Sequence, residues 1–141
     1  MANDASDFAR SMGIATSGLR AQAGRMRVIS ENIANADSTS PTAGGNPYRR
    51  KVPSFSSALD RTLDAKVVTL GKIRSDQTAF RIKHEPGNPA ADAAGNVKYP
   101  NVNPLVEMTD MRDAQRSYEA NLNVIGATRR MIQRTLDILK A

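Results

Sequence analysis

The sequence predicts a mainly α fold, in which long N- and C-terminal helices pair as a coiled coil around a short middle region of loop and β-ribbon. Three observations predict it. Apolar residues recur in alternating steps of three and four near both ends of the chain, as in a heptad repeat. All seven prolines lie between residues 41 and 104, which excludes a continuous helix there. We therefore expect residues 1–37 and 105–141 to form one helical domain, with residues 38–104 inserted between them.

The C-terminal segment carries the longer of the two patterns. Its apolar stripe consists of Met108, Met111, Tyr118, Leu122, Ile125, Ile132, Leu136 and Leu139. The polar residues Gln115 and Arg129 occupy the remaining positions of the stripe, where they either fix the register or lie where the stripe meets solvent. As a helix this segment is roughly 50 Å long, too long for a small core to cover. We therefore expect it to need a partner helix.

The N-terminal segment supplies that partner. Its stripe consists of Phe8, Met12, Ala15, Leu19, Gln22, Met26, Ile29 and Ile33. Gly13, Gly18 and Gly24 lie inside the same segment, and each costs up to about 1 kcal/mol of helix stability relative to Ala. Two interpretations stay open. The glycines either let another backbone approach closely or keep the segment unfolded until assembly.

From these two patterns we select eight residues for a helix-pairing seam. They are Met12, Leu19, Met26, Ile29, Leu122, Ile125, Ile132 and Leu136. Burying such a seam, at about 25 cal/mol per Å² of apolar surface, offsets the conformational entropy lost when the helices become ordered.

The first half of the middle region begins with prolines and glycines. Residues 38–53 read STSPTAGGNPYRRKVP, which is typical of a loop or an extended strap. Residues 54–63 are expected to form a short helix, because Phe55, Leu59 and Leu63 lie four residues apart.

The second half of the middle region is richer in β-forming residues. Residues 66–70 and 79–85 contain β-branched and apolar side chains and predict a small β-ribbon. Residues 86–104 contain four prolines and two glycines, and we expect an irregular connection there.

The net charge of +6 is concentrated in one part of the chain. Residues 48–84 hold nine basic and three acidic side chains, whereas the segments on either side are balanced. Such a patch attracts either nucleic acid or an acidic protein surface. The patch has few aromatic residues and matches no common nucleic-acid-binding motif, so we favour an acidic protein surface and expect no nucleic-acid partner.

Composition excludes several classes of site. The chain has no cysteine, which excludes disulfides, thiolate metal sites and a cysteine nucleophile. No window approaches the 18 apolar residues of a membrane-spanning helix. The N-terminal residues lack a basic segment followed by an apolar run, so we expect no cleaved secretory signal.

No group of residues predicts catalysis. The single histidine, His84, lies in a polar segment without a nucleophile motif nearby, and a solvated role is expected. Asp113, Arg116 and Glu119 are spaced for ordinary ion pairing on a helix surface. We therefore expect no enzyme activity, no cofactor and no metal.

Two stretches carry a resemblance to a known family. Residues 29–51, ISENIANADSTSPTAGGNPYRRK, are similar to the N-terminal signature of bacterial flagellar rod, hook and hook-associated proteins. Residues 99–140, from YPNVNPLVEM to TLDILK, resemble the C-terminal signature of the same family. The short middle region is similar to that of the proximal rod proteins.

The resemblance implies a structural subunit that polymerises into the proximal part of the rod, the drive shaft that spans the periplasm. It implies export through the flagellar type III apparatus without a cleaved signal. Its partners would be copies of itself, other rod subunits and the export apparatus. On this basis we expect subunit contacts at Asn32, Asn35, Tyr48, Arg49 and Arg50.

Two other functional classes stay open from the sequence. The heptad patterns alone also fit a coiled-coil adaptor or a secretion-system component outside the flagellum. The basic middle region also fits a nucleic-acid-binding protein.

Overall fold

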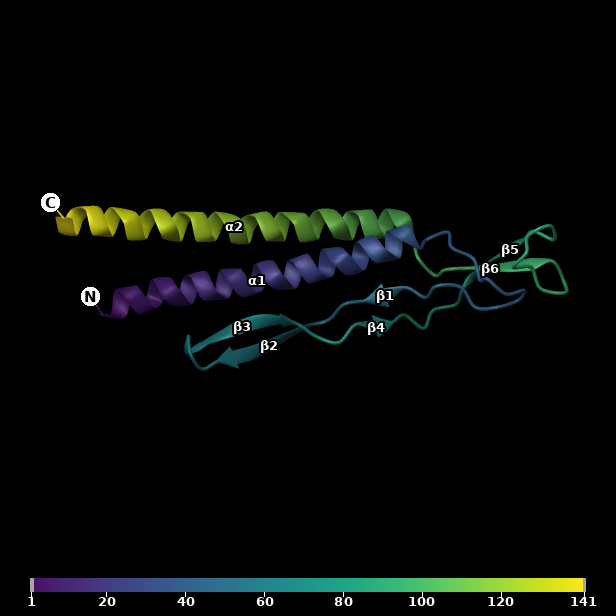
Figure 1. Ribbon diagram of the computed structural model, residues 1–141, viewed down its shortest axis with the longest axis horizontal. Coiled ribbons are helices and arrows are strands. Elements are labelled where there is room, and N and C mark those ends of the chain that lie inside the picture. The colour runs from purple at the N-terminus through teal and green to yellow at the C-terminus, as the bar shows by residue number, and fades with distance from the viewer. Residues whose placement is uncertain (1, 141) are drawn as a thin grey trace. The chain divides into compact units, whose positions relative to one another are not determined.

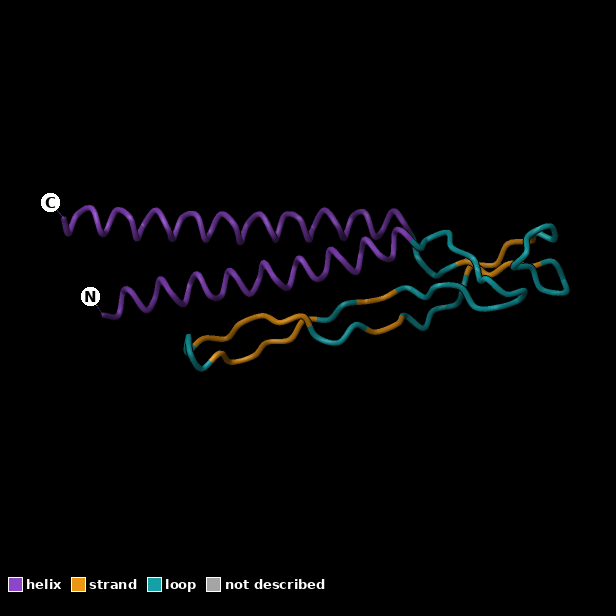
Figure 2. Tube along the Cα trace, in the orientation of Figure 1, coloured by secondary structure: helices purple, strands orange, loops and turns teal. Residues whose placement is uncertain are grey.

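Two long helices and three small sheets make up the protein. The computed structural model describes residues 2–140, with side chains from residue 7 onward, so residues 1 and 141 of the predicted domains lie outside the described part. The helices are α1 (Ala2–Ala34) and α2 (Pro104–Lys140). The strands are β1 (Lys51–Val52), β2 (Phe55–Asp60), β3 (Ala65–Leu70), β4 (Arg74–Ser75), β5 (Arg81–His84) and β6 (Asn96–Tyr99) (Figures 1 and 2).

Each sheet is an antiparallel pair of strands. The pairs are β1–β4, β2–β3 and β5–β6, so that the β1–β4 pair encloses the β2–β3 hairpin along the chain. Lys51 lies opposite Ser75 in the first pair, and Phe55 lies opposite Leu70 in the second. The register shifts by one residue between these pairs, as in a β-bulge, and Pro53, which has no backbone N–H to donate, lies in the interval between them.

The chain divides into two compact units. The first contains the described residues up to Met26, the segment Ser54–Lys72, and α2 from Asp113 onward. The second contains Arg27–Pro53 and Ile73–Arg112. In the second unit Ala90, Val97 and Tyr99 form a small core on the β5–β6 pair. In the first unit the most buried side chains are small, notably Ala15, Ala21 and Ala114.

The prediction of a mainly α fold built on a coiled-coil pair is wrong. The two helices account for 33 and 37 residues, and six strands account for 24 more. Helix α1 has a second neighbour besides α2, because the β2–β3 hairpin covers another of its faces within the first unit. A backbone N–H of the hairpin, that of Val68, donates to Ser17 Oγ of α1 at 3.2 Å. A helix covered in this way does not need a continuous seam with one partner.

The short helix expected over residues 54–63 is also wrong. Residues 55–60 form strand β2, paired along its whole length with β3. The four-residue spacing of apolar side chains does not bury them on a helix face, and Leu59 is 61% exposed. Cross-strand bonds favour the strand instead, including a 2.8 Å bond between Ser56 Oγ and Thr69 Oγ1.

The two segments expected to form one β-ribbon are strands with other partners. Residues 65–70 form β3, which pairs with β2, and residues 81–84 form β5, which pairs with β6. Strand β6 lies in the region expected to be irregular. Its buried Val97 and Tyr99 alternate with half-buried neighbours, as in a strand with one packed face. No helix in the described part of the chain is long and apolar enough to cross a membrane.

Candidate functional site

The polar centre of the second unit is Asn32, near the end of α1. Its Nδ2 atom donates to the carbonyl of Lys51 at 2.8 Å and to Glu107 Oε2 at 3.0 Å. Its Oδ1 atom accepts from the Tyr48 hydroxyl at 2.8 Å and from the Lys51 amide at 2.9 Å. Asn32 is 1% exposed, and these bonds use both donors and both lone pairs of its amide. It therefore fixes the end of α1, the strap that includes residues 48–51 and the start of α2.

Glu107, on the first turns of α2, is the second part of this centre. It is 1% exposed, and its Oε1 atom accepts from Arg50 Nε at 2.6 Å. Arg50 also lies 3.5 Å from Asp76 and 3.8 Å from Asp110. Burial alone lowers the pKa of Arg50, but the hydrogen bond and charge of Glu107, together with Asp76, outweigh it and raise that pKa. The buried carboxylate is thus neutralised by a charge that stays fully ionised.

Asn101 joins the strap to the segment after β4. Its Oδ1 accepts from the Arg50 amide at 2.8 Å, and its Nδ2 donates to Thr78 Oγ1 at 2.8 Å and to the Asp76 carbonyl at 3.1 Å. The backbone of Thr78 donates to the Asp76 carboxylate, and this bond is the main cause of the lowered pKa of Asp76. We call the set formed by Asn32, Arg50, Asp76, Asn101 and Glu107 the junction.

Tyr48 and Arg49 extend the junction along the strap. Burial, followed by the charges of Glu31 and Glu107, raises the pKa of Tyr48 to about 12. The guanidinium of Arg49 stacks on the ring of Phe80 at 4.2 Å and donates to the Asp76 carbonyl at 3.0 Å.

The residues expected at subunit contacts therefore have partners inside the chain. Asn32, Tyr48, Arg49 and Arg50 bond to one another or to the segments around the junction. Asn35 is half-buried, and its Nδ2 donates to the Glu31 carbonyl at 2.8 Å. Their role between subunits stays a prediction.

In the first unit, the glycines of α1 lie where other segments approach closely. A Cβ atom added to Gly18 would lie 2.8 Å from Asn121 Nδ2 of α2, and one added to Gly24 would lie 2.7 Å from Leu70 Cδ2 of β3. A Cβ atom on Gly13 would collide with Leu63 in the turn of the hairpin. At all three positions the atoms that approach closely belong to a side chain, so the expected approach of another backbone is wrong. Whether the segment is unfolded before assembly stays a prediction.

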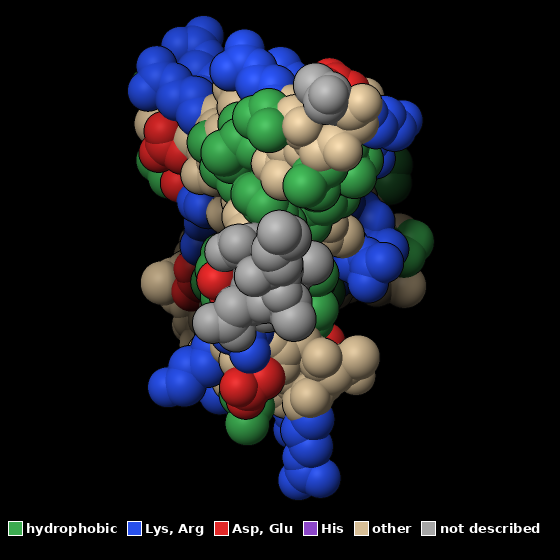
Figure 3. Space-filling model, turned by 90° about the vertical axis from the view of Figure 1, so that its left-hand side faces the viewer, with side chains coloured by type: hydrophobic (Ala, Val, Ile, Leu, Met, Phe, Trp, Pro, Cys, Tyr) green, Lys and Arg blue, Asp and Glu red, His purple; other side chains and the backbone are tan. Residues whose placement is uncertain are grey.

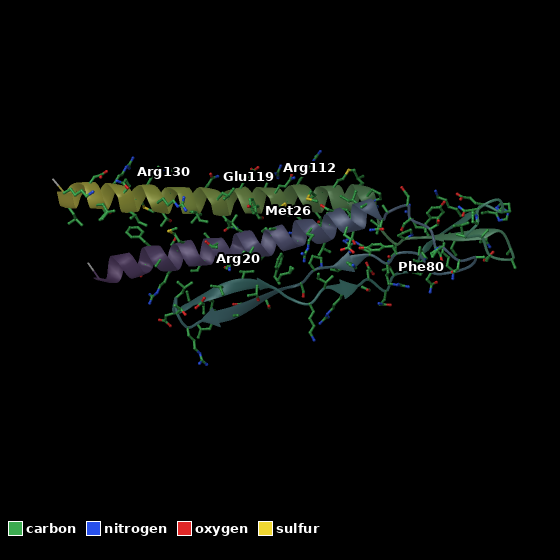
Figure 4. The ribbon with its side chains drawn as sticks, viewed as in Figure 1. Arg20, Met26, Phe80, Arg112, Glu119 and Arg130 are labelled. Atoms are coloured by element: carbon green, nitrogen blue, oxygen red, sulfur yellow. The ribbon has the colours of Figure 1, made fainter. Side chains whose placement is uncertain are left out.

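The eight residues of the predicted seam differ in burial. Ile29 is buried, and Met12, Leu19, Met26, Ile125 and Ile132 are half-buried. Figure 4 shows Met26 on the side of α1 that faces α2. Leu122 and Leu136 are each 46% exposed.

A different register describes the protected side of α2. The residues that are buried or half-buried at steps of four and three are Glu107, Met111, Ala114, Tyr118, Asn121, Ile125, Thr128 and Ile132. Half of these positions carry small or polar side chains, so an apolar pattern alone misses them. A search for steps of four and three that also accepts Ala, Asn and Thr as close-packing residues would have identified Ala114, Asn121 and Thr128. Glu107 lies on the same spacing.

Much apolar surface of α2 stays open. Leu105, Val106, Met108, Leu122, Val124, Met131, Leu136, Ile138 and Leu139 are all exposed. Figure 3, which views the molecule along its length, shows hydrophobic side chains gathered beside Lys and Arg side chains. No cluster of three potential metal-ligating side chains occurs among the described residues.

Comparisons with known proteins agree with this arrangement. Residues 12–40 match a family described as flagella basal body rod protein, and residues 93–138 match one described as flagellar basal body rod FlgEFG protein C-terminal. The flagellar basal-body rod protein FlgC of Agrobacterium fabrum is 53% identical over 128 residues, which cover 91% of this chain and 92% of that protein. The chain belongs to the FlgC family of flagellar basal-body rod proteins. As a FlgC-family member it is a structural rod protein of the flagellum and not an enzyme.

More distant FlgC relatives cover the chain equally well. FlgC of Bacillus subtilis is 39% identical over 145 residues, covering 92% of this chain and 97% of that protein. FlgC of Aquifex aeolicus is 36% identical over 135 residues, covering 95% and 98%. The resemblance found in the two end signatures is confirmed. Asn32 lies in one matched segment and Glu107 in the other, so the junction joins the two parts that define the family.

Proposed function

We propose that this chain polymerises, with copies of itself and with other rod subunits, into the proximal part of the rod in the periplasmic space. The observation that carries this proposal is the row of exposed apolar side chains along α2. A chain that works alone rarely leaves such a surface open to water, and covering it supplies about 25 cal/mol per Å². Neighbouring subunits are the natural cover in a protein of this family.

The predicted seam residues enter this proposal in two groups. Met12, Leu19, Met26, Ile29, Ile125 and Ile132 are proposed to pack the helices of one subunit in the first and second units. Leu122 and Leu136 are proposed to contact a neighbouring subunit, because nearly half of each side chain is open.

The residues expected at subunit contacts are proposed to favour association by fixing the conformation of the strap. Asn32 and Arg50 hold residues 48–51 against the end of α1 and the start of α2. Arg49 bonds to the Asp76 carbonyl, and Asn35 bonds to the Glu31 carbonyl. A neighbour would then meet a strap with one fixed conformation, which lowers the entropy cost of association.

We also propose export through the flagellar export apparatus without removal of a signal. The support is packing: residues 7–26 of α1 contribute to the first unit, where Gly18 meets Asn121 and Ser17 bonds to β3. Cleavage within this segment would remove those contacts. No nucleic-acid partner is expected.

One experiment tests the proposal. A tagged copy of the chain is expressed in a strain that lacks the gene, swimming is measured in soft agar, and hook–basal bodies are purified and probed for the tag. We expect restored swimming, the tag in the basal bodies, and an intact N-terminal segment by mass spectrometry. Restored swimming without the chain in basal bodies would contradict the proposal.

A further inference from the structure

The open part of α2 has three distinct rows. One row, which we call the first ridge, consists of Val106, Asp113, Ala120, Val124, Met131 and Ile138. A second ridge, on the other side of the helix, consists of Met108, Gln115, Leu122, Arg129 and Leu136. Between them lies an outer stripe of Arg112, Arg116, Glu119, Arg130 and Arg134. All three sets follow from 3.6 residues per turn, and every member is exposed.

The three rows differ in chemistry. Figure 4 shows Arg112, Glu119 and Arg130 along the same side of α2, and this outer stripe is charged throughout. Each ridge is largely apolar and holds a single charge, which is Asp113 in the first and Arg129 in the second. Among the described residues, neither of these two charges has an ion-pair partner. A helix with an apolar ridge on each side of a charged stripe is suited to neighbours on both sides and water in front.

We propose that the first ridge of one copy packs against the second ridge of a parallel copy, displaced by sixteen residues along the helix. This contact rests on the proposed function and specifies it. The displacement pairs Asp113 of one copy with Arg129 of the next, and it corresponds to roughly 24 Å. It also places Val106 opposite Leu122 and Ala120 opposite Leu136, so the apolar positions meet one another.

Other displacements that keep the ridges facing are poorer. A shift of two residues places Asp113 opposite Gln115. A shift of nine places Asp113 opposite Leu122. Both cover a charge with a group that cannot neutralise it, which is costly. Because the two ridges are different surfaces, the contact does not close on itself, and repetition gives a helical array.

Engineered cysteines test the displacement, since the chain has none of its own. The test variant carries Val106→Cys and Leu122→Cys, and the control carries Val106→Cys and Met108→Cys. In one copy the first pair is roughly 24 Å apart along the helix, far beyond disulfide reach. Purified basal bodies are oxidised and run on a non-reducing gel.

We expect a ladder of linked copies from the test variant and none from the control. A ladder from the control alone, or no ladder from either variant although both are present in basal bodies, would overturn the displacement. It would leave the proposed function intact. Absence of the native chain from basal bodies would instead contradict both.

Charge exchange tests the ion pair separately. Asp113→Arg and Arg129→Asp are each expected to cause a loss of swimming, and the double variant is expected to recover it. The matched control Arg130→Asp, on the outer stripe, should swim normally. A double variant that swims no better than either single variant would overturn the pairing.

Discussion

At the scale of single residues, Glu107 is the most constrained side chain of the second unit. Its carboxylate is out of water and accepts one bond from Asn32 and one from Arg50. Such a group stabilises the fold only while both partners remain, because an unpaired buried charge loses its hydration without compensation.

Replacing Glu107 by Gln tests this directly. We expect Glu107→Gln to lower the free energy of unfolding by about 3 kcal/mol, because Arg50 loses its closest countercharge. The measurement is urea denaturation followed by tyrosine emission, which is informative because the chain has no tryptophan. The control Glu119→Gln, exposed on the same helix, should change it by less than about 0.5 kcal/mol. Equal losses of unfolding free energy in the two variants would contradict the stabilising role of Glu107 in the junction.

Tyr48 gives the junction a dependence on alkaline pH. Its pKa is raised to about 12, and the phenol of an unfolded chain ionises near 10. The folded state thus holds its proton more tightly. The resulting stability is fully present below about pH 10 and is lost as the pH rises towards 12.

The corresponding prediction concerns Tyr48→Phe. Tyrosinate absorbance of the native chain should show a late step near pH 12 that the variant lacks, and the variant should lose less stability between pH 10 and 12. Superimposable titration curves of the two proteins would contradict the assignment.

At this scale the sequence singled out residues whose bonds in the structure lie within the chain. Tyr48, Arg49 and Arg50 were expected at subunit contacts, and the structure shows their partners inside the chain. Asn32 and Glu107 are separated by 75 positions, and no local spacing reveals such a contact. The pattern of apolar residues also could not predict that Glu107 is buried.

At the scale of elements, helix α1 depends on small residues. Gly18 admits Asn121 of α2, and Gly24 admits Leu70 of the hairpin. Glycine is ordinarily a weakness in a helix, and replacement by alanine ordinarily stabilises it.

Replacement by alanine should change the stability in opposite directions at Gly126 and at Gly18. Gly126→Ala is expected to stabilise the chain by roughly 0.5–1 kcal/mol, since the added Cβ meets only Arg130 Nη1 at 3.5 Å. Gly18→Ala is expected to destabilise it by about 1–3 kcal/mol through overpacking against Asn121. Thermal unfolding followed by circular dichroism measures both.

A second substitution checks the cause. Asn121→Ala combined with Gly18→Ala should recover most of the lost stability, because the side chain in the way is removed. No recovery would mean that Gly18 acts through backbone conformation rather than space.

Element types were predictable where a pattern was long and failed where it was short. The two helices follow from more than twenty residues of periodicity each. The six residues of β2 carry a four-residue spacing of Phe55 and Leu59 and no alternation of apolar and polar residues, so only pairing with β3 makes them a strand. Strand β6 could not be found, because its four residues lie directly between Gly95 and Pro100.

At the scale of the whole molecule, the exposure of a side chain predicts whether its replacement impairs folding of the chain or only its assembly into the rod. Leu122 and Ile125 lie three residues apart on α2, but Leu122 is exposed and Ile125 is half-buried. Replacement of either by Asp should abolish swimming and incorporation into the rod.

The two variants should differ in the free chain. Leu122→Asp should leave the far-ultraviolet circular dichroism of the purified chain unchanged, because the carboxylate is solvated. Ile125→Asp should reduce its helical signal, because a charge enters the side of α2 that packs within the first unit. Normal swimming of Leu122→Asp would refute a role for this surface in assembly.

The family could be predicted from the two end signatures, and the alignments confirm it over most of the chain. The sequence did not reveal that the middle region supplies neighbours to both helices. Packing determines which segments contact the helices, and charge and composition alone do not predict those contacts.

The junction has a consequence for how such chains change over time. It ties residues 32 and 50 to residues 76, 101 and 107, so the segment between the strap and β4 is a loop whose ends are fixed by the junction. Doubling the length of a loop with fixed ends costs only about 0.6 kcal/mol. Insertions at the hairpin turn after Asp60 can therefore lengthen the chain while the residues of the junction keep their bonds. Additional domains can arise at this turn without changes to the junction.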